Sequence, residues 1–450
     1  MKKLFGTDGI RAVAGHHPLD FLSVYALGKA LVELLRNKGL EPDILIGRDT
    51  RESGVWIERA LVQGIRAGRG RALSAGVITT SAISFLTLKH KYSAGVVISA
   101  SHNPYQDNGI KIFSSEGMKI ADDWEDALEK AIHEQKEVTA ANHIPLRTRR
   151  SLVNEYIEFL TGQIDPLPSS RGLKVVLDCS NGAGSAIAPR VLAAVGCRVA
   201  VINNGPDGRN INHACGSLHP HDLTHHVIKE QADIGVAYDG DADRALWVDE
   251  RGRILNGDHT LFVQSRFMKA RGRLSADTVV ATTMSNMGLE VALQRERIKL
   301  HRTRVGDKYV LEQMIALGAN LGGEQSGHTI FLDSCPTGDG ILTSLKMIEA
   351  MVAADAPLSK LVQGFEEFPQ ILTNVHVSRK ADFAEFPEII GVMAEIKRQL
   401  GGAGRLDVRY SGTEPVARVM VEGRDRAEIE ALAQRMSAAI AKYLGTDQAI

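Results

Sequence analysis

Apolar and polar positions along the first third of the chain predict helices and strands in turn. Residues 21–38 and 54–69 carry apolar side chains at helical spacing. Short apolar runs at 43–47 and 95–100 are typical of buried strands. Strands that alternate with helices predict a parallel or mixed sheet that is covered on both faces.

The same alternation recurs twice further along the chain. Apolar runs at 174–179 and 232–238 predict two strands of a second unit. A third unit begins with a predicted strand at 278–283, which helices at 287–298 and 307–318 follow. We therefore expect three similar α/β units, although their residues are too different to indicate a sequence repeat.

The pattern changes near residue 368. Residues 371–377, 405–411 and 417–423 read as strands, and helices are predicted at 386–400 and 426–444. The order βαββα predicts a smaller α+β domain with an antiparallel sheet.

Chain length bounds the number of domains. At roughly 150 residues per domain, the 450 residues correspond to about three domains, and four also fit. The charged stretch 121–150 predicts a surface helix followed by a linker. We place the four domains at 1–150, 151–255, 256–367 and 368–450.

Charge and composition exclude several functional classes. The formal net charge is -1, so no overall field favours nucleic acid or an anionic membrane as a partner. No run of 18 or more apolar residues occurs, and the N-terminus lacks the apolar segment of a secretion signal. The four cysteines form no CxxC pair, which indicates reduced thiols rather than a zinc or redox motif. A cytoplasmic location is therefore expected.

The sharpest chemical signal is the segment DGDADR, which directly follows the apolar run at 232–238. In an extended chain alternate residues point the same way, so Asp239, Asp241 and Asp243 could converge on one side. Three clustered carboxylates repel unless a cation neutralises them, and oxygen ligands suit Mg²⁺ or Ca²⁺. A solvated acidic loop is the plain alternative. A calcium-binding EF-hand loop fits poorly, because Arg244 stands where that motif requires glycine.

A second signal is the segment SASHNP at the end of the strand predicted at 95–100. Its residues also suit a plain turn. A serine hydrolase is disfavoured, because His102 would point away from Ser101 in an extended chain and no G-x-S-x-G elbow occurs. A serine that carries phosphate needs no activating base, and Lys111 follows nearby as a counter-charge, although it could be a surface cation.

A third segment, GGEQSGH at 322–328, combines flexible glycines with polar side chains. Glu324, Ser326 and His328 offer the donors and acceptors that sugar hydroxyls require. A polar turn, with His328 as a satisfied core histidine, is the alternative interpretation.

A fourth segment, RYSGTEP at 409–415, resembles a phosphate cradle. Arg409 and Arg418 supply positive charge, and Ser411, Gly412 and Thr413 supply hydroxyl and amide donors. The segment lacks the Walker pattern, so it is not a P-loop. An ordinary turn with surface arginines is the alternative.

Taken together, these motifs make the chain resemble the alpha-D-phosphohexomutases. The resemblance covers nearly the whole chain, and PDGRNINHACGS at 206–217 and VGDKYVLE at 305–312 add to it. It implies an α/β protein with three related α/β/α domains with mixed sheets plus a smaller C-terminal α+β domain, around a central cleft. The motifs that carry it are FGTDGIR at 5–11, SASHNPYQDNGIKIF at 99–113, DGDADR at 239–244, GGEQSGH at 322–328 and RYSGTEPVARVMVE at 409–422.

The resemblance also implies a chemistry and its residues. Ser101 matches a phosphorylated serine that exchanges phosphate with a phosphosugar through a 1,6-bisphosphate, which also serves as activator. Arg11, Lys111 and Arg244 match basic residues near the transferring phosphate, and His328 matches a proposed general base. The remaining implied sets are the Mg²⁺ ligands Ser101 (through its phosphate), Asp239, Asp241 and Asp243, the sugar contacts Glu324 and Ser326, and the phosphate loop Arg409, Ser411, Gly412 and Thr413 with Arg418.

Substrate preference is the least defined expectation. Asp307 and Gln325 resemble family members that act on glucosamine phosphates, and glucose and mannose phosphates are the near alternatives. Ala12, residues 78–82 and Leu218 depart from the family pattern, but none is expected to touch the chemistry. A sugar-phosphate binding protein without catalysis is the more distant alternative, and both a monomer and a homodimer remain open.

Overall fold

The structure is a computed structural model, and the residues it describes fall into two compact units. One unit comprises residues 1–282 and 301–363, and the other comprises 283–300 and 364–450. The described residues are 4–6, 8–134, 146–164, 172–411 and 415–445.

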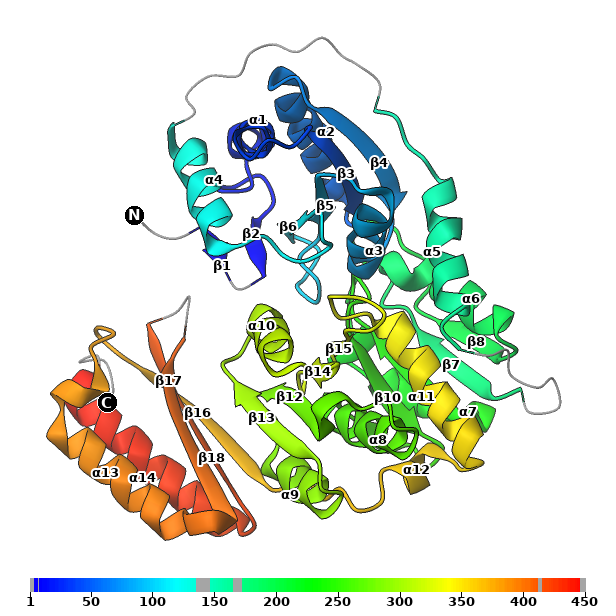
Figure 1. Ribbon diagram of the computed structural model, residues 1–450. Coiled ribbons are helices and arrows are strands. Elements are labelled where there is room, and N and C mark those ends of the chain that lie inside the picture. Colours follow the sequence, from blue (N-terminus) through cyan, green and yellow to red (C-terminus); the bar gives the residue numbers. More distant parts are fainter. Residues whose placement is uncertain (1–3, 7, 135–145, 165–171, 412–414, 446–450) are drawn as a thin grey trace. The chain divides into compact units, whose positions relative to one another are not determined.

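A six-stranded mixed sheet forms the N-terminal part of the first unit (Figure 1). Its strand order is β1-β2-β6-β5-β3-β4, in which β3 pairs parallel with β4 and β5, and β6 pairs antiparallel with β5 and β2. The strands are β1 (Phe5–Gly6), β2 (Gly9–Val13), β3 (Asp43–Arg48), β4 (Arg71–Val77), β5 (Ala94–Ile98) and β6 (Asp107–Ser114). The helices are α1 (Phe21–Asn37), α2 (Glu52–Ala67), α3 (Thr80–His90) and α4 (Asp122–Glu134).

Alternation along the strands decides which helix covers which face of this sheet. Ile44 and Ile46 of β3 pack into the apolar core that α1 and α2 share. Gly47, which faces the opposite side of β3, and Gly95 of β5 lie beneath α3, where a Cβ on either glycine would come within 3 Å of Ile83. The helices predicted at 21–38 and 54–69 are α1 and α2, and part of the predicted linker, residues 135–145, lies outside the described residues.

Two further mixed sheets complete the α/β part of the fold. The second has the order β11-β10-β9-β7-β8, and the third has the order β13-β12-β14-β15. The strands are β7 (Lys174–Asp178), β8 (Arg198–Ile202), β9 (Ile234–Tyr238), β10 (Ala245–Asp249), β11 (Ile254–Leu255), β12 (Thr278–Thr282), β13 (Lys299–Thr303), β14 (Leu321–Gly323) and β15 (Thr329–Phe331). The helices are α5 (Ser151–Thr161), α6 (Ala188–Ala194), α7 (His221–Glu230), α8 (Gly257–Ala270), α9 (Met287–Arg295), α10 (Asp307–Leu317), α11 (Gly340–Ala354) and α12 (Leu358–Leu361).

The three sheets share one topological feature. In each, a strand of the parallel part turns back into an antiparallel neighbour, namely β5 into β6, β9 into β10, and β14 into β15. These turns carry the serine segment, the acidic segment and the GGEQSGH segment respectively. The expectation of three related α/β domains is confirmed.

The C-terminal domain is the predicted α+β structure. Its three strands are antiparallel in the order β16-β18-β17, and α13 and α14 lie side by side on one face of the sheet (Figure 1). This confirms the order βαββα. The elements are β16 (Gln370–His376), α13 (Pro387–Leu400), β17 (Gly404–Tyr410), β18 (Val416–Gly423) and α14 (Arg426–Leu444).

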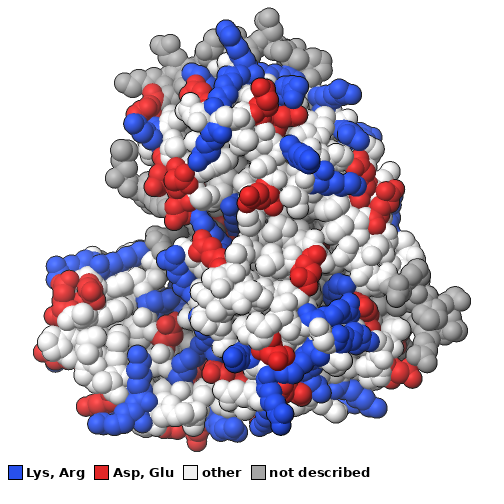
Figure 2. All heavy atoms as spheres, viewed as in Figure 1, with Lys and Arg blue, Asp and Glu red and all other residues white. Residues whose placement is uncertain are grey.

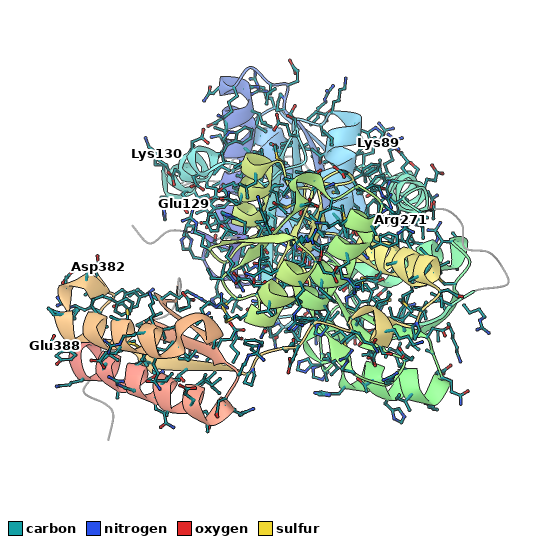
Figure 3. All side chains as sticks on the ribbon, turned by 60° about the horizontal axis from the view of Figure 1, so that its bottom comes forward. Lys89, Glu129, Lys130, Arg271, Asp382 and Glu388 are labelled. Carbon is teal, nitrogen blue, oxygen red and sulfur yellow. The ribbon has the colours of Figure 1, made fainter. Side chains whose placement is uncertain are left out.

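The surface carries both signs of charge. On the face seen in Figure 2, basic and acidic side chains are interspersed over the α/β part and the C-terminal domain alike. Some charged groups also fasten the fold: Glu129 of α4, labelled in Figure 3, accepts hydrogen bonds of 2.7 Å from the backbone N–H groups of Leu4 and Phe5. None of the described helices is long and apolar enough to cross a membrane.

Gly28 of α1 and Gly64 of α2 allow these two helices to approach each other closely, and Gly64 gives a test of this packing. A Cβ added to Gly64 of α2 would lie 2.0 Å from the carbonyl oxygen of Tyr25 in α1. Alanine favours a helix over glycine by about 1 kcal/mol, but overpacking typically costs about 1–3 kcal/mol, and a clash with backbone cannot relax by a rotamer change. We expect Gly64→Ala to lower the free energy of unfolding by at least about 1 kcal/mol in urea titrations.

Gly391 of α13 is the matched control, because a Cβ there would meet no atom within 4 Å. Gly391→Ala should stabilise the C-terminal domain by about 0.5–1 kcal/mol. Equal effects of the two substitutions would contradict the close packing of α1 on α2.

Candidate active site

Ser101 lies in the turn between β5 and β6 and is 1% exposed. Its backbone has a φ of 51°, in the left-handed region that costs a non-glycine residue about 1–2 kcal/mol. Its Oγ donates a hydrogen bond to Asp239 Oδ2. The expectation that His102 points away from Ser101 is wrong, because the chain turns here instead of remaining extended, and His102 Nδ1 lies 3.3 Å from Ser101 Oγ.

His102 is nevertheless unsuited to hold a positive charge. Burial, together with the nearby cations of Arg244 and Arg11, lowers the pKa of His102 to about 4. The imidazole is therefore neutral near pH 7. The hydroxyl of Ser101 is directed to a carboxylate and not to this ring.

The acidic segment forms the turn between β9 and β10, and it also departs from an extended conformation. Ala242 has a φ of 56°, and its N–H donates to the carbonyl oxygen of Asp239 at 3.0 Å. The carboxylates of Asp239, Asp241 and Asp243 converge because of this turn, and not because alternate residues of a strand share a face. One oxygen from each lies within 4.8 Å of the others, and all three residues are buried.

The electrostatics of this cluster fit a bound cation. Burial and the charges of Asp243 and Asp241 raise the pKa of Asp239 well above its usual range. Asp241 Oδ1 is buried and has no hydrogen-bond partner within the described part of the chain. A hard divalent cation takes oxygen ligands, and it would satisfy that oxygen and favour the ionised form of Asp239. The three carboxylates could therefore hold a metal ion.

Lys111 on β6 is 1% exposed and joins this cluster to the N-terminal strands. Its Nζ lies 2.8 Å from Asp241 Oδ2, and 3.1 Å from both Asp243 Oδ2 and Asp8 Oδ2. Burial would lower the pKa of Lys111, but these carboxylates outweigh burial and raise that pKa well above its usual range. The ammonium is therefore fixed in its charged form. Asp8 was not singled out from the sequence, although it stands inside the motif FGTDGIR.

His328 lies in the turn between β14 and β15, next to the turn of the acidic segment, and its backbone forms an isolated bridge with Arg244. Its Nδ1 is 3.6 Å from Asp243 Oδ1, and its Nε2 is 3.5 Å from Asp307 Oδ2. Burial would lower the pKa of His328, but Asp243 and Asp307 raise it to about 9. The Gly338 N–H donates to Nε2 at 3.1 Å, a bond that only the neutral ring can accept. Neutralising Asp243 with a cation would favour that neutral form.

A second lysine extends the network. Lys119 Nζ forms ion pairs with Asp8 and with Asp307 Oδ2, the latter at 2.6 Å. Burial would lower the pKa of Lys119, but Asp307 and Asp8 raise it. No local pattern indicates these ion pairs, because the partners of Lys119 lie 111 and 188 positions away in the chain.

The remaining predicted residues of this unit lie around the cluster. Arg244 Nε is 4.0 Å from Asp239 Oδ2 and 3.9 Å from Asp243 Oδ1. Arg11 pairs with Asp8. Glu324 Oε1 accepts a hydrogen bond of 3.2 Å from the Gly306 N–H, and Ser326, which is exposed, donates to Glu324 Oε2 at 3.4 Å.

The predicted phosphate loop belongs to the C-terminal domain, where it joins β17 to β18. Arg409 and Arg418 are paired across these strands, and Arg418 Nη2 lies 3.4 Å from Ser411 Oγ. Lys380, which the sequence did not indicate, donates to the carbonyl oxygen of Ser411 at 2.5 Å. Gly412 and Thr413 lie outside the described residues.

Thr80 is a further neighbour of the carboxylates that the sequence missed. Its Oγ1 donates to Asp241 Oδ2 at 2.5 Å, and its N–H donates to the Asp241 carbonyl oxygen at 3.2 Å. The departure from the family pattern at 78–82 was not expected to touch the chemistry. The structure instead places Thr80, the first residue of α3, in contact with Asp241 of the acidic segment.

Comparison with known proteins identifies the family. Models of the four domains of phosphoglucomutase/phosphomannomutase match in chain order: α/β/α domain I at residues 2–139, α/β/α domain II at 154–252, α/β/α domain III at 256–368 and the C-terminal domain at 372–439. The chain therefore belongs to the phosphoglucomutase/phosphomannomutase family of phosphohexomutases, which are isomerases.

Relatives found by sequence and by structure agree with this assignment to the family. A phosphoglucosamine mutase of Koribacter versatilis is 46% identical over 99% of this chain and 98% of that protein, and one of Solibacter usitatus is 45% identical over 99% of both. A phosphoglucomutase/phosphomannomutase family protein of Burkholderia thailandensis has the same fold, with a TM-score of 0.81 at 24% identity over 98% of both chains. An Aspergillus fumigatus N-acetylphosphoglucosamine mutase, solved with GlcNAc-6P and magnesium, has a TM-score of 0.69 at 18% identity over 98% of this chain and 95% of that one.

The hydrogen bond from Thr80 to Asp241 gives a test of the metal site that needs no activity assay. Partners that orient a metal ligand are typically worth about 10- to 100-fold in metal affinity or activity. We expect Thr80→Val, which keeps the shape but removes the hydroxyl, to weaken Mg²⁺ binding about 10-fold in calorimetric titrations. Thr80→Ser should restore most of the affinity, and equal affinity of the Val and Ser variants would remove Thr80 from the site.

Proposed function

We propose that this chain interconverts glucosamine 6-phosphate and glucosamine 1-phosphate through phosphorylated Ser101. The observation that carries the proposal is the hydroxyl of Ser101, buried and hydrogen-bonded to Asp239 within a cluster of three carboxylates. Near-full-length relatives named phosphoglucosamine mutase support this choice of sugar. The product would supply UDP-N-acetylglucosamine and cell-wall precursor synthesis.

The proposed reaction consists of two phosphoryl transfers. In the first, the bond between phosphorus and Ser101 Oγ breaks while phosphorus bonds to a sugar hydroxyl. That hydroxyl loses its proton, Ser101 Oγ takes up a proton, and the product is a sugar 1,6-bisphosphate. In the second, the bond between the other phosphate and its sugar oxygen breaks while phosphorus bonds to Ser101 Oγ, which loses its proton as the sugar oxygen takes one up. The bisphosphate also explains activation, because it can phosphorylate Ser101 by the second step alone.

The carboxylates of Asp239, Asp241 and Asp243, with the phosphate on Ser101, would hold Mg²⁺. The ion supplies a positive charge that offsets the charge on the phosphoryl oxygens. Lys111 fixes the positions of two of the carboxylates through contacts of 2.8 and 3.1 Å.

The basic residues around the three carboxylates have two proposed roles, which are charge stabilisation and proton transfer. We assign Arg11, Arg244 and Lys111 to stabilising charge on the transferring phosphoryl group, as preorganised cations do in phosphoryl transfer. His328 is the candidate for taking the proton of the sugar hydroxyl. Only the neutral imidazole can take that proton. The contact with Asp243 favours the protonated ring, so a cation that neutralises Asp243 would favour the form that acts as a base.

Substrate binding is assigned to two loops. We propose that Glu324 and Ser326 contact the sugar hydroxyls, for which a carboxylate and a hydroxyl are suitable partners. Arg409, Ser411 and Arg418 would bind the phosphate that is not transferred, together with Gly412 and Thr413. Lys380 adds a third cation to that loop, and arginine forks match phosphate geometry.

Loss of the hydroxyl tests the covalent step. Ser101→Ala should abolish mutase activity and the incorporation of one phosphoryl group, which intact-mass spectrometry of protein treated with glucose 1,6-bisphosphate would reveal. Ser437→Ala, on α14 of the C-terminal domain, is the control and should retain both. Normal turnover by Ser101→Ala would exclude a phosphoserine mechanism.

Rates on three sugars test the choice of substrate. Glucosamine 6-phosphate should be isomerised with a kcat/KM at least about 10-fold above those of glucose 6-phosphate and mannose 6-phosphate, since a site built to pair a polar group discriminates strongly against analogues that lack it. A preference for glucose 6-phosphate or mannose 6-phosphate would contradict the proposed sugar but not the membership of the family. Binding of all three without turnover would identify a non-catalytic protein.

A further inference from the structure

We propose that Arg51 and Asn212 form a clamp on the backbone carbonyls of Ser101 and Asn103, and that this carbonyl clamp positions Ser101 for phosphoryl transfer. The inference rests on the proposed function, in which Ser101 carries the transferred phosphate. Neither residue touches the reacting atoms, so both are positioning residues.

Arg51 directs its guanidinium at the serine turn. It precedes α2 and is 0% exposed. Its Nη2 donates to the carbonyl oxygens of Ser101 at 2.9 Å and Asn103 at 2.8 Å, while Nη1 donates to those of Asp107 at 3.1 Å and Pro104. Four carbonyls of one turn are thus bound by one rigid, permanently charged fork.

Asn212 reaches the same two carbonyls from a distant part of the chain. It lies in the segment 206–217, and the proposed reaction assigns no role to that segment. Its Nδ2 donates to the carbonyl oxygens of Ser101 at 2.8 Å and Asn103 at 3.1 Å. Both carbonyls therefore accept from a side chain of the first domain and from one of the second.

The N–H side of Ser101 is tied to the same arginine. Ser101 N donates to Ser99 Oγ at 2.9 Å, and Ser99 Oγ donates to Asp49 Oδ2 at 2.7 Å. Asp49 Oδ2 also accepts from Arg51 Nε at 2.9 Å. The buried carboxylate of Asp49 therefore neutralises the charge of Arg51. Arg51 holds the carbonyl of Ser101 directly, and it holds the N–H of Ser101 through Asp49 and Ser99.

The clamp also borders the acidic segment, in the turn between β9 and β10. A Cβ on Gly240 would lie 2.6 Å from the Ser101 carbonyl oxygen and 2.9 Å from Asn212 Nδ2. The carbonyl that the clamp binds is thus packed directly against the backbone between Asp239 and Asp241. Because Ser101 is held at a φ of 51°, release of its carbonyl would let the turn relax and move Oγ away from Asp239. A displacement of about 1 Å is enough to slow a positioned reaction about 100-fold.

Asn212→Asp tests the clamp with little change in shape. Asn212 has a φ of 57°, which aspartate also tolerates, so the substitution exchanges a donor for an acceptor facing two carbonyls. The rate to measure is single-turnover phosphoryl transfer to glucosamine 6-phosphate, expressed per phosphorylated Ser101 as counted by intact mass. We expect that rate to fall at least about 10-fold while KM changes less than about 2-fold, as for loss of positioning.

Asn181→Asp is the matched control. Asn181 also has a left-handed φ, of 50°, and like Asn212 it is 8% exposed. Its Nδ2 donates to the carbonyl oxygen of Asn210, at 3.3 Å, and so makes its bond to the 206–217 segment and not to the serine turn. Its rate per phosphorylated site should stay within about 3-fold of wild type, since it loses a bond of the same kind elsewhere. An equal loss in both variants would overturn the clamp and indicate a general effect of destabilisation.

Arg51→Lys provides a second variant that keeps the buried charge beside Asp49 but loses the fork. It should reproduce the loss of rate per phosphorylated site seen in Asn212→Asp. Wild-type rates in both variants would refute the clamp and leave the proposed function standing. Failure of the wild-type protein to accept phosphate at Ser101 would instead refute the function on which the clamp rests.

Discussion

A buried lysine that contacts three carboxylates, with a fourth beside them, is the constraint on which the site depends. Asp8, Asp241 and Asp243 each lie within 3.1 Å of Lys111 Nζ, and Asp239 lies beside them. A buried charge that loses its partner costs about 3–5 kcal/mol, which is comparable to much of the stability of a domain. These ion pairs therefore hold β6, the turn between β1 and β2, and the turn between β9 and β10 together. Removal of one of these partners would therefore disturb the geometry of the site and destabilise the first unit at the same time.

A repeated topology explains how segments far apart in the chain meet at this cluster. Each α/β sheet reverses from a parallel strand into an antiparallel neighbour, and each reversal carries one motif. Each of these turns lies at the ends of its two strands, where it can contact a turn of another domain. Ser101 reaches Asp239 in this way, and the bridge between Arg244 and His328 joins the second turn to the third. The motifs are chemically different, but the fold presents them in equivalent positions.

Sequence reasoning succeeded where the information is local and failed where partners are distant. Helices such as 21–38 are predicted well, because apolar spacing along the segment itself determines them. The convergence of the three aspartates was predicted for the wrong reason, since a turn and not an extended strand produces it. Thr80 and Lys119 went unnoticed, because their roles come from Asp241 and Asp307 on remote segments. Arg51 could have been found from the sequence, because it follows the buried strand β3 by three residues. A charged residue at such a place is a candidate for binding a neighbouring turn.

The conformation of Ser101 shows why such a turn defies prediction from local preference. A left-handed φ costs a non-glycine residue about 1–2 kcal/mol. The residue at this position is a serine, so its type does not indicate that conformation. Against that cost stand the bonds from Arg51, Asn212 and Ser99 and the bond to Asp239. Hydrogen bonds that involve a charged group contribute about 1.5–3 kcal/mol each, so two of them outweigh the backbone term. Long-range polar contacts therefore decide the backbone at the one residue whose position matters most for transfer, and local propensity has too little weight to reveal it.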